Sequence, residues 1–301
     1  MKVMKIPRLR MPKIVRSKLS AAKLLGGVMK NSLQFKLRRG AFAKRYKTHD
    51  FDTIIVDMDG TIYRTDANVE ALSIFYPERT EDNRTYGEEI YDSILAKIAS
   101  GQYGIEQGIV EGNKFLMAKK VRLEDFSLVL ERVTKTLRKP LIAALKKLKQ
   151  KGKTIVLATL SSKNFGEMLN SYIAEKYGFS FDYVLGTELE FDPSGQIIGV
   201  KSIVGTKDYD YAGILVKTKL SALRDAMQKE GKTLDARKTL LITDSYGDID
   251  LAKMLVTILI KPQKPTAAQK VSQRLGLADY ILPDDSNLRT NLESIVLGPK
   301  K

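Results

Sequence analysis

The sequence predicts a parallel α/β sheet, and two observations carry this prediction. Short apolar, β-branched segments alternate with helical patterns from residue 153 to residue 295, which is typical of parallel strands joined by right-handed helical crossovers. The balance of 43% hydrophobic and 29% charged residues over 301 positions fits a globular chain of one large domain or two ordinary ones.

The expected strands are short, apolar and followed by polar loops. They cover residues 51–56, 153–158, 181–185, 239–243, 256–260 and 280–282, with a hairpin in 190–200 that turns at Asp192-Pro193-Ser194-Gly195. Helices are expected at residues 162–177, 219–229, 248–255, 265–275 and 287–295.

Residues 62–152 have no strand pattern and read as helical. The helical patterns lie near residues 68–75, 88–98, 123–137 and 140–149. We therefore expect an α/β core formed by residues 50–65 and 138–301, a helical insert at 66–137, and a separate N-terminal arm at 1–49.

The N-terminal arm, residues 1–49, is strongly basic. It holds 15 Lys and Arg residues and no Asp or Glu, whereas the rest of the chain is nearly neutral. A basic amphipathic pattern over 15–37 indicates a segment that lies on its own core, on an anionic membrane surface or, third in rank, on nucleic acid. The longest apolar stretch, 254–260, is far shorter than the roughly 20 residues of a spanning helix. We expect a cytoplasmic protein, with peripheral membrane attachment as the variant.

The residue types narrow the chemistry. The chain has no cysteine, which excludes disulfides, thiolate nucleophiles, iron–sulfur clusters and zinc sites built on cysteine. His49 is the single histidine, so a His pair or a serine–histidine base has almost no raw material. Carboxylates, hydroxyls and lysines, together with a hard metal, remain.

Polar side chains follow three of the predicted strands, where ligands of open α/β sheets collect. They are Asp57 and Asp59, Thr159 and Ser161, and Asp244 and Asp248. Lys219, at the start of the predicted helix 219–229, is a fourth polar position. Asp57 and Asp244 can share one Mg²⁺, which prefers oxygen ligands and offsets the repulsion between carboxylates and a phosphate dianion. Lys219 adds a positive charge. These side chains together predict a phosphate site.

The loop after the first strand completes this site. Backbone amides of residues 58–61, from Met58 through Gly60 to Thr61, and the Thr159 hydroxyl are expected to donate to phosphoryl oxygens. One carboxylate is then free to attack phosphorus. Asp59, two residues on, would protonate the leaving oxygen and later deprotonate the attacking water.

Two positions have a neighbour that could take the same role. Lys217 rivals Lys219, which is preferred because it opens the helix bearing Leu220 and Leu223. Ser161 rivals Thr159 as the hydroxyl that contacts phosphate, or it caps the next helix.

The run Asp57-Met58-Asp59-Gly60-Thr61 resembles the first motif of the haloacid dehalogenase-like (HAD) hydrolase superfamily. Thr159 resembles its second motif, Lys219 its third, and Thr243-Asp244-Ser245-Tyr246-Gly247-Asp248 its fourth, in family order over residues 51–285. The helical insert is similar to the cap of many HAD phosphatases, and the stretch from Leu185 to Gly199 resembles the phosphoserine-phosphatase-like branch.

The resemblance implies a Rossmann-like core with a helical cap, Mg²⁺, a covalent aspartyl-phosphate and hydrolysis of a small phosphomonoester. It implies that Asp57 is the nucleophile and Asp59 the general acid/base. Mg²⁺ would be held by Asp57, the backbone carbonyl of Asp59 and Asp244, with Asp248 and Ser245 in support.

The chain departs from phosphoserine phosphatases at three places. Gly60 stands where they usually carry Ser, Asp66 stands at the position of a substrate-contacting Glu, and Leu160-Ser161 replaces a Gly pair. The sequence therefore leaves the substrate open. The alternative hypothesis is a catalytically dormant HAD-fold binding protein, recruited to an anionic membrane or to nucleic acid by its basic arm.

Overall fold

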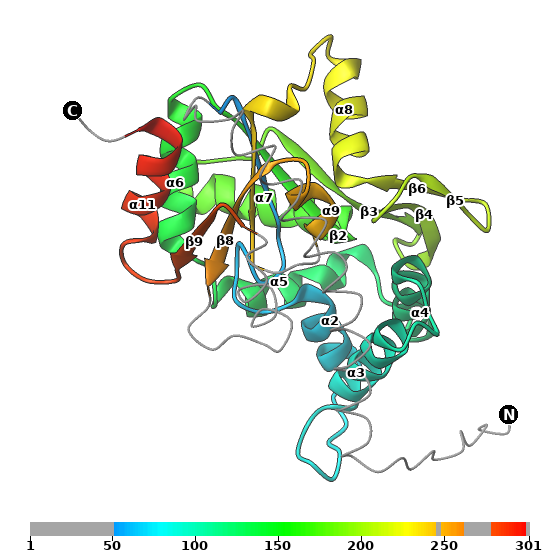
Figure 1. Cartoon of the computed structure of the whole chain (residues 1–301). Helices are drawn as coiled ribbons and strands as arrows, with labels where there is room; N and C mark the ends of the chain where they lie inside the picture. Colours follow the sequence, from blue (N-terminus) through cyan, green and yellow to red (C-terminus); the bar gives the residue numbers. More distant parts are fainter. Residues whose placement is uncertain (1–50, 245–247, 262–277, 299–301) are drawn as a thin grey trace, which may run out of the picture.

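The structure is a computed structural model, and it describes residues 51–244, 248–261 and 278–298 (Figure 1). The N-terminal arm, Ser245 and the helix expected at 265–275 lie outside the described residues. Within the described ranges no helix is long and apolar enough to cross a membrane.

A nine-stranded sheet forms the centre of the molecule, in the order β5-β6-β4-β3-β2-β1-β7-β8-β9. The strands are β1 (Thr53–Val56), β2 (Thr154–Ser162), β3 (Tyr183–Phe191), β4 (Ile197–Gly205), β5 (Tyr209–Tyr211), β6 (Ile214–Thr218), β7 (Thr239–Thr243), β8 (Val256–Lys261) and β9 (Tyr280–Pro283). In the part of this order that runs β3-β2-β1-β7-β8-β9, every pair of neighbouring strands is parallel. The predicted parallel α/β sheet is confirmed.

The described helices cover both faces of this sheet. They are α2 (Ala67–Phe75), α3 (Tyr86–Ala99), α4 (Ile105–Ala118), α5 (Phe126–Thr134), α6 (Lys139–Gln150), α7 (Lys163–Tyr177), α8 (Lys219–Lys229), α9 (Ile249–Ala252) and α11 (Leu288–Leu297). Successive strand residues face opposite sides. In β1, Ile54 and Val56 belong to the cluster that includes α6, α7 and α11, whereas Ile55 belongs to the cluster with α8 and α9.

The part of the sheet beyond β3 is mixed. β3 and β4 form the antiparallel hairpin that the turn residues predict. β4 then pairs in parallel with β6, and β5 pairs antiparallel with β6. The sequence did not predict β5 and β6, because they are short and their turn contains Ala212, a non-glycine residue with φ 51°, before Gly213.

Four helices, α2 to α5, lie between β1 and α6 in the chain. In Figure 1, α2, α3 and α4 gather at the lower right, away from α11, and α5 lies nearer the centre. A single helix over 123–137 was expected here. Instead a 3-10 turn at Leu123–Asp125 leads into α5, which ends at Thr134, and Leu137 pairs with Tyr63. Helix α4 was not expected. Apolar residues of these helices are continuous with the cluster around α6 and α7.

Candidate active site

Asp57 follows the central strand β1 at its carboxyl end. Its amide donates to the Ile242 carbonyl at 2.9 Å, which continues the pairing with β7 and fixes the backbone at this edge. The Lys219 Nζ lies 2.7 Å from Asp57 Oδ1 and 2.7 Å from Asp248 Oδ1. All three residues are buried. Three predicted site residues, from three separate segments, therefore form one ion-pair cluster.

The start of α8 directs Lys219 toward Asp57. Thr218 caps the helix, and its hydroxyl accepts from the Ser221 amide at 3.1 Å. Asp208, in the loop before β5, accepts from the Thr218 amide and from the Ser221 hydroxyl, each at 2.6 Å. Lys217, the rival lysine, instead pairs with Asp225 and is partly exposed.

Burial and charge act against each other in this cluster. Burial raises the pKa of the Asp57 carboxyl well above its usual value, and the carboxylates of Asp248 and Asp244 raise it further, although Lys219 opposes them. Burial alone would lower the pKa of the Lys219 ammonium, but Asp248 and Asp57 outweigh it and raise that pKa above its usual value. Lys219 therefore stays charged.

Thr61 brings Asp57 and Asp244 together. Its hydroxyl oxygen lies 3.3 Å from Asp57 Oδ2 and 3.3 Å from Asp244 Oδ1, so those two carboxylate oxygens are at most twice that distance apart. Gly60 makes this approach possible. Its φ is +72°, and a Cβ at Gly60 would lie 2.7 Å from Cγ of Asp244. Any other residue there would displace the Asp244 carboxylate.

Asp59 has a different environment from Asp57, although it is only two residues away. Oδ1 accepts from the Tyr63 hydroxyl at 2.6 Å and from the Ala67 amide at 2.7 Å. Oδ2 accepts from the Thr159 hydroxyl at 3.1 Å and from the Ser161 hydroxyl at 2.6 Å. Both hydroxyls proposed for the second motif therefore converge on Asp59.

Irregular pairing places these two hydroxyls. β2 pairs with β1 only as far as Leu157, and its register with β3 shifts between Ala158 and Ser162. The Ser161 amide donates to the Thr159 hydroxyl at 2.9 Å. The cap of α7 is Ser162 and not Ser161, because the Ser162 hydroxyl accepts from the Phe165 amide at 3.3 Å.

Two of the loop amides expected to bind phosphate are used inside the loop. The Gly60 amide donates to the Thr65 carbonyl at 2.9 Å, and the Thr61 amide donates to the Met58 carbonyl at 3.2 Å. The amides of Met58 and Asp59 remain the candidates for a phosphoryl oxygen. The side chain of Met58 itself is fully buried in the core.

Asp66 lies near Asp59, but its carboxylate caps the N-terminus of α2. As the N-cap of α2 it accepts from the Asn68 amide at 2.8 Å, and it accepts from the Tyr91 hydroxyl at 2.6 Å. Burial, with a further contribution from the Asp59 charge, raises the pKa of Asp66 to about 7. An N-cap Asp before a helical pattern is a signal readable from sequence, whereas the contact with Tyr91 is not.

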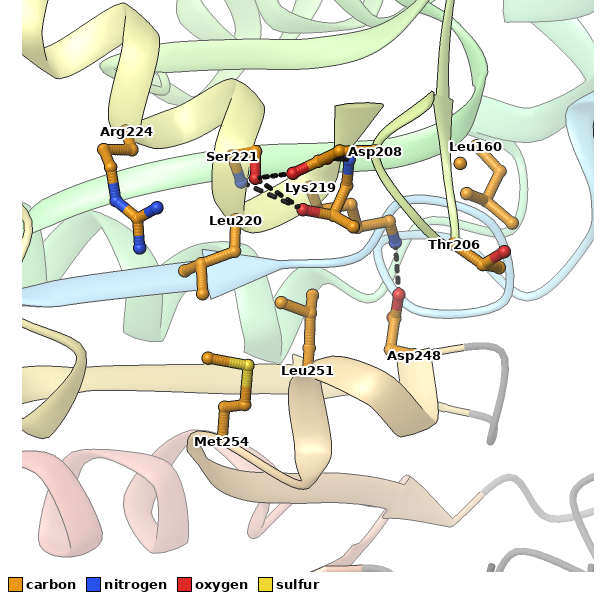
Figure 2. A pocket seen from close by; sticks show the side chains of 12 residues that line it. Leu160, Thr206, Asp208, Lys219, Leu220, Ser221, Arg224, Asp248, Leu251 and Met254 are labelled. Carbon is orange, nitrogen blue, oxygen red and sulfur yellow. Dashed lines mark hydrogen bonds and ion pairs between the residues drawn. The ribbon is translucent and has the colours of Figure 1, made fainter. Parts of the chain in front are cut away.

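A cavity of about 250 Å³ adjoins Lys219, between α8, α9 and the loop after β4. Figure 2 shows the Lys219–Asp248 ion pair on one side of it and Arg224 on the other. Apolar side chains of Leu220, Leu251 and Met254 line it as well. Solvent-sized space therefore reaches the buried lysine.

The carboxylates of this site are possible ligands for Mg²⁺. Within the described ranges no group of three or more His, Cys, Asp or Glu side chains is arranged to hold a metal ion. The pair formed by Asp57 and Asp244 nevertheless fits this ion, since both supply oxygen ligands and Mg²⁺ often takes one or two carboxylates and completes its shell with water and substrate. Three buried aspartates against one lysine also leave an excess of negative charge when all are ionised.

Comparisons with known proteins agree with this fold. The family model of the haloacid dehalogenase-like hydrolases matches residues 54–253, a range that contains Asp57, Thr159, Lys219 and Asp244. The chain belongs to this family. The search of the curated proteins found no match.

Solved structures similar to this chain include phosphoserine phosphatases. A phosphoserine phosphatase in apo form has a TM-score of 0.55 at 17% identity, over 81% of this chain and 98% of that one. A phospho-aspartyl intermediate analogue of phosphoserine phosphatase has a TM-score of 0.52 at 18% identity, over 81% and 98%. A phosphoserine phosphohydrolase-like protein from Francisella tularensis has a TM-score of 0.54 at 15% identity, over 80% and 99%. These likenesses establish a shared fold with a Rossmann-like core.

Proposed function

We propose that this chain is a Mg²⁺-dependent phosphomonoester hydrolase that works through an aspartyl-phosphate on Asp57. The observation that carries the proposal is the cluster at the edge of the sheet, where Lys219 pairs with Asp57 and Thr61 contacts both Asp57 and Asp244. A lysine and a divalent cation around a carboxylate nucleophile is an arrangement suited to phosphoryl transfer.

The reaction divides into two displacements. An Asp57 carboxylate oxygen attacks phosphorus, the ester P–O bond breaks, and Asp59 gives a proton to the departing alkoxide. Water then attacks the aspartyl-phosphate, Asp59 takes a proton from that water, and the bond between phosphorus and Asp57 breaks to release inorganic phosphate.

The chain's other residues hold and orient the reacting groups. Lys219 neutralises charge on the phosphoryl group and keeps Asp57 in place. The Thr159 hydroxyl, which contacts Asp59, would turn to a phosphoryl oxygen, while the Ser161 hydroxyl keeps the Asp59 carboxyl in place for proton transfer. Asp57, the Asp59 backbone carbonyl and Asp244 would hold Mg²⁺. The ion would offset phosphate charge and orient the phosphoryl group.

Support for a small phosphorylated substrate comes from the neighbours, which include a substrate-bound phosphoserine phosphatase complex. In this chain Asp66 is already bound by α2 and Tyr91, so we do not extend the phosphoserine specificity to it. No observation on the described residues favours the dormant binding protein.

Turnover of p-nitrophenyl phosphate tests the proposal. We expect hydrolysis with Mg²⁺, its loss on chelation, and a phosphorylated protein after acid quench. Asp57→Asn should abolish turnover and labelling while its melting temperature stays close to wild type. Folded protein that is inactive with every divalent metal tried would contradict the proposal and favour the dormant binding protein.

The role of residues 1–49 stays a prediction. Deleting residues 1–46 should leave hydrolysis of p-nitrophenyl phosphate intact and weaken binding to anionic vesicles. Unchanged vesicle binding together with weaker, strongly salt-dependent duplex binding would assign the arm to nucleic acid.

A further inference from the structure

Arg138 is a buried arginine directly behind the loop that carries the proposed catalytic aspartates. It immediately precedes α6, and its exposed fraction is 1%. Charged residues are almost never buried to this degree unless they are paired. Nothing in the motif pattern pointed to Arg138, because it follows the helical insert by sequence and meets the loop only in the folded chain.

One nitrogen of Arg138 contacts three carbonyls of that loop. Nη1 donates to the carbonyl of Gly60, to that of Thr61 at 2.7 Å and to that of Tyr63 at 3.2 Å. Hydrogen bonds from a charged donor are about twice as strong as neutral ones. Three carbonyls from four consecutive residues therefore turn toward one guanidinium.

The same loop segment positions the reacting groups. Asp59 precedes Gly60, and the Thr61 hydroxyl contacts both Asp57 and Asp244. The Gly60 backbone already lies against the Asp244 carboxylate with no room for a Cβ. A small movement of this peptide would change the placement of Asp59, Thr61 and Asp244 together.

Arg138 is fixed from its other side by Asp284, which follows β9. Arg138 Nε lies 3.0 Å from Asp284 Oδ2, and both side chains are almost fully buried. Arg64 binds the same carboxylate in a bidentate manner, from Nε at 2.7 Å and from Nη2 at 3.0 Å. The Asp284 amide donates to the Lys261 carbonyl at 3.0 Å, which anchors it to the end of β8. The outer strands thus hold Arg138 in place.

We propose that Arg138 is a positioning residue of the phosphatase reaction, which holds the Gly60–Tyr63 carbonyls so that Asp59 and Thr61 face the phosphoryl group, with Asp284 as its fixed counter-charge. This inference rests on the proposed function of Asp57 and Asp59. Arg138 touches no reacting atom and acts through the loop backbone.

Two substitutions of Arg138 and one control variant distinguish a residue that positions the catalytic loop from one that only stabilises the fold. Arg138→Lys keeps the charge, but its single nitrogen cannot bind Asp284 and the loop carbonyls from two separate positions as Nε and Nη1 do, and Arg138→Ala removes the group. We expect kcat per folded molecule to fall about tenfold to a hundredfold in both, as small misplacements of reacting groups do, with KM within about twofold. Arg64→Met is the control, because the Arg64 side chain also binds Asp284 but its other hydrogen bond goes to the Thr136 carbonyl and not to the Gly60–Tyr63 carbonyls. Its kcat should stay within about twofold of wild type.

Chemical rescue supplies a readout that a structural brace would not give. Millimolar guanidinium chloride should restore part of kcat in Arg138→Ala, whereas urea, a neutral molecule of similar shape, should not. If the lysine and alanine variants melt earlier but keep wild-type kcat per folded molecule, the proposal is wrong and Arg138 only stabilises the fold.

Amide exchange in the absence of substrate makes the inference testable apart from activity. The Gly60, Thr61 and Ile62 amides all donate within the loop, at 2.9, 3.2 and 2.8 Å. Their exchange should quicken in Arg138→Lys and stay near wild type in Arg64→Met. Equal exchange in both variants would overturn the proposal. A wild-type protein that hydrolyses nothing would instead refute the proposed function, and the exchange rates would still report whether Arg138 holds the loop. If Arg138→Ala does not fold, Arg138→Lys and Asp284→Asn decide by the same measurements, and a wild-type kcat in both refutes the proposal.

Discussion

Asp57 and Asp59 are separated by one residue, yet they belong to opposite kinds of environment. Asp57 lies in a cluster of full charges, with Lys219 at 2.7 Å and two further aspartates nearby. Asp59 accepts four hydrogen bonds from neutral donors, three hydroxyls and one amide. Within this cluster the Lys219 cation favours the ionised Asp57 that must attack, against the burial and the neighbouring carboxylates that raise its pKa. Neutral hydroxyls that can rotate suit a group that must gain and lose a proton.

Apart from the loss of the nucleophile itself, the largest effect should come from removing the proton-transfer group. Asp59→Asn should lower kcat about 10²–10⁴-fold with little change in KM, because general acid–base catalysis has that magnitude. The phosphorylated enzyme should also persist longer after acid quench, since Asp59 activates the water of the second step. A kcat within threefold of wild type would remove Asp59 from the mechanism and end the contrast with Asp57.

The charged cluster around Asp57 should contribute measurably to the free energy of unfolding. Lys219→Met leaves the buried Asp57 and Asp248 without their shared cation, so we expect a loss of about 3–5 kcal/mol in the free energy of unfolding. Lys217→Met is the matched control, since it breaks only a partly exposed pair with Asp225 and should cost less than about 1 kcal/mol. Urea denaturation measures both. Equal losses would show that the Lys219 cluster is not a buried ion-pair site.

Removal of either hydroxyl that contacts Asp59 should change the kinetics by about tenfold, but in a different parameter for each. Thr159→Val should raise KM and the inhibition constant of inorganic phosphate, if Thr159 turns to the phosphoryl group. Ser161→Ala removes the shorter contact to Asp59, 2.6 Å against 3.1 Å, and should lower kcat instead. Steady-state kinetics with phosphate as inhibitor distinguishes them. The reverse pattern would exchange the two roles.

The smallest effect concerns Asp66 beside Asp59. The folded protein keeps a proton on Asp66 up to about pH 7, whereas the unfolded chain releases it near pH 4, so this group lowers stability as pH rises between the two values. Asp66→Asn retains a good N-cap without the charge. Its free energy of unfolding should exceed that of wild type by on the order of 1–3 kcal/mol at pH 8 and match it near pH 4. A difference that does not change with pH would contradict the shifted pKa.

Local signals predicted much of the sheet and its flanking helices. The helix Lys219–Lys229 and the strand Thr239–Thr243 occur at the predicted residues, and α7 ends at Tyr177 as predicted, with Gly178 as its C-cap at φ +61°. Each of these elements has a clear hydrophobic period and is bounded by residues that typically begin or end a helix or strand. Propensity is therefore sufficient to find them.

Elements that depend on packing were missed or misplaced. Helix α4 has Gly104 as its N-cap, which offers no side-chain hydrogen bond, and it contains Gly108 and Gly112, which weaken a helix pattern. The structure explains Gly108, since a Cβ there would lie 2.5 Å from Cδ1 of Ile98 on α3. Gly108 gives the Ile98 side chain room between the two helices, whereas local reasoning counts a glycine against the helix.

The sequence by itself determined the order of the polar motifs, the residue types that could serve a phosphate site, and their places at strand ends. Only the tertiary structure decided which groups meet: Thr61 with both aspartates, Asp59 with two hydroxyls of β2, and Arg138 with a loop 77 residues away and with Asp284 beyond it. The physical reason is range. Propensity and periodicity act over a few neighbouring residues, whereas ion pairs and buried hydrogen bonds depend on chain crossings that no short segment encodes.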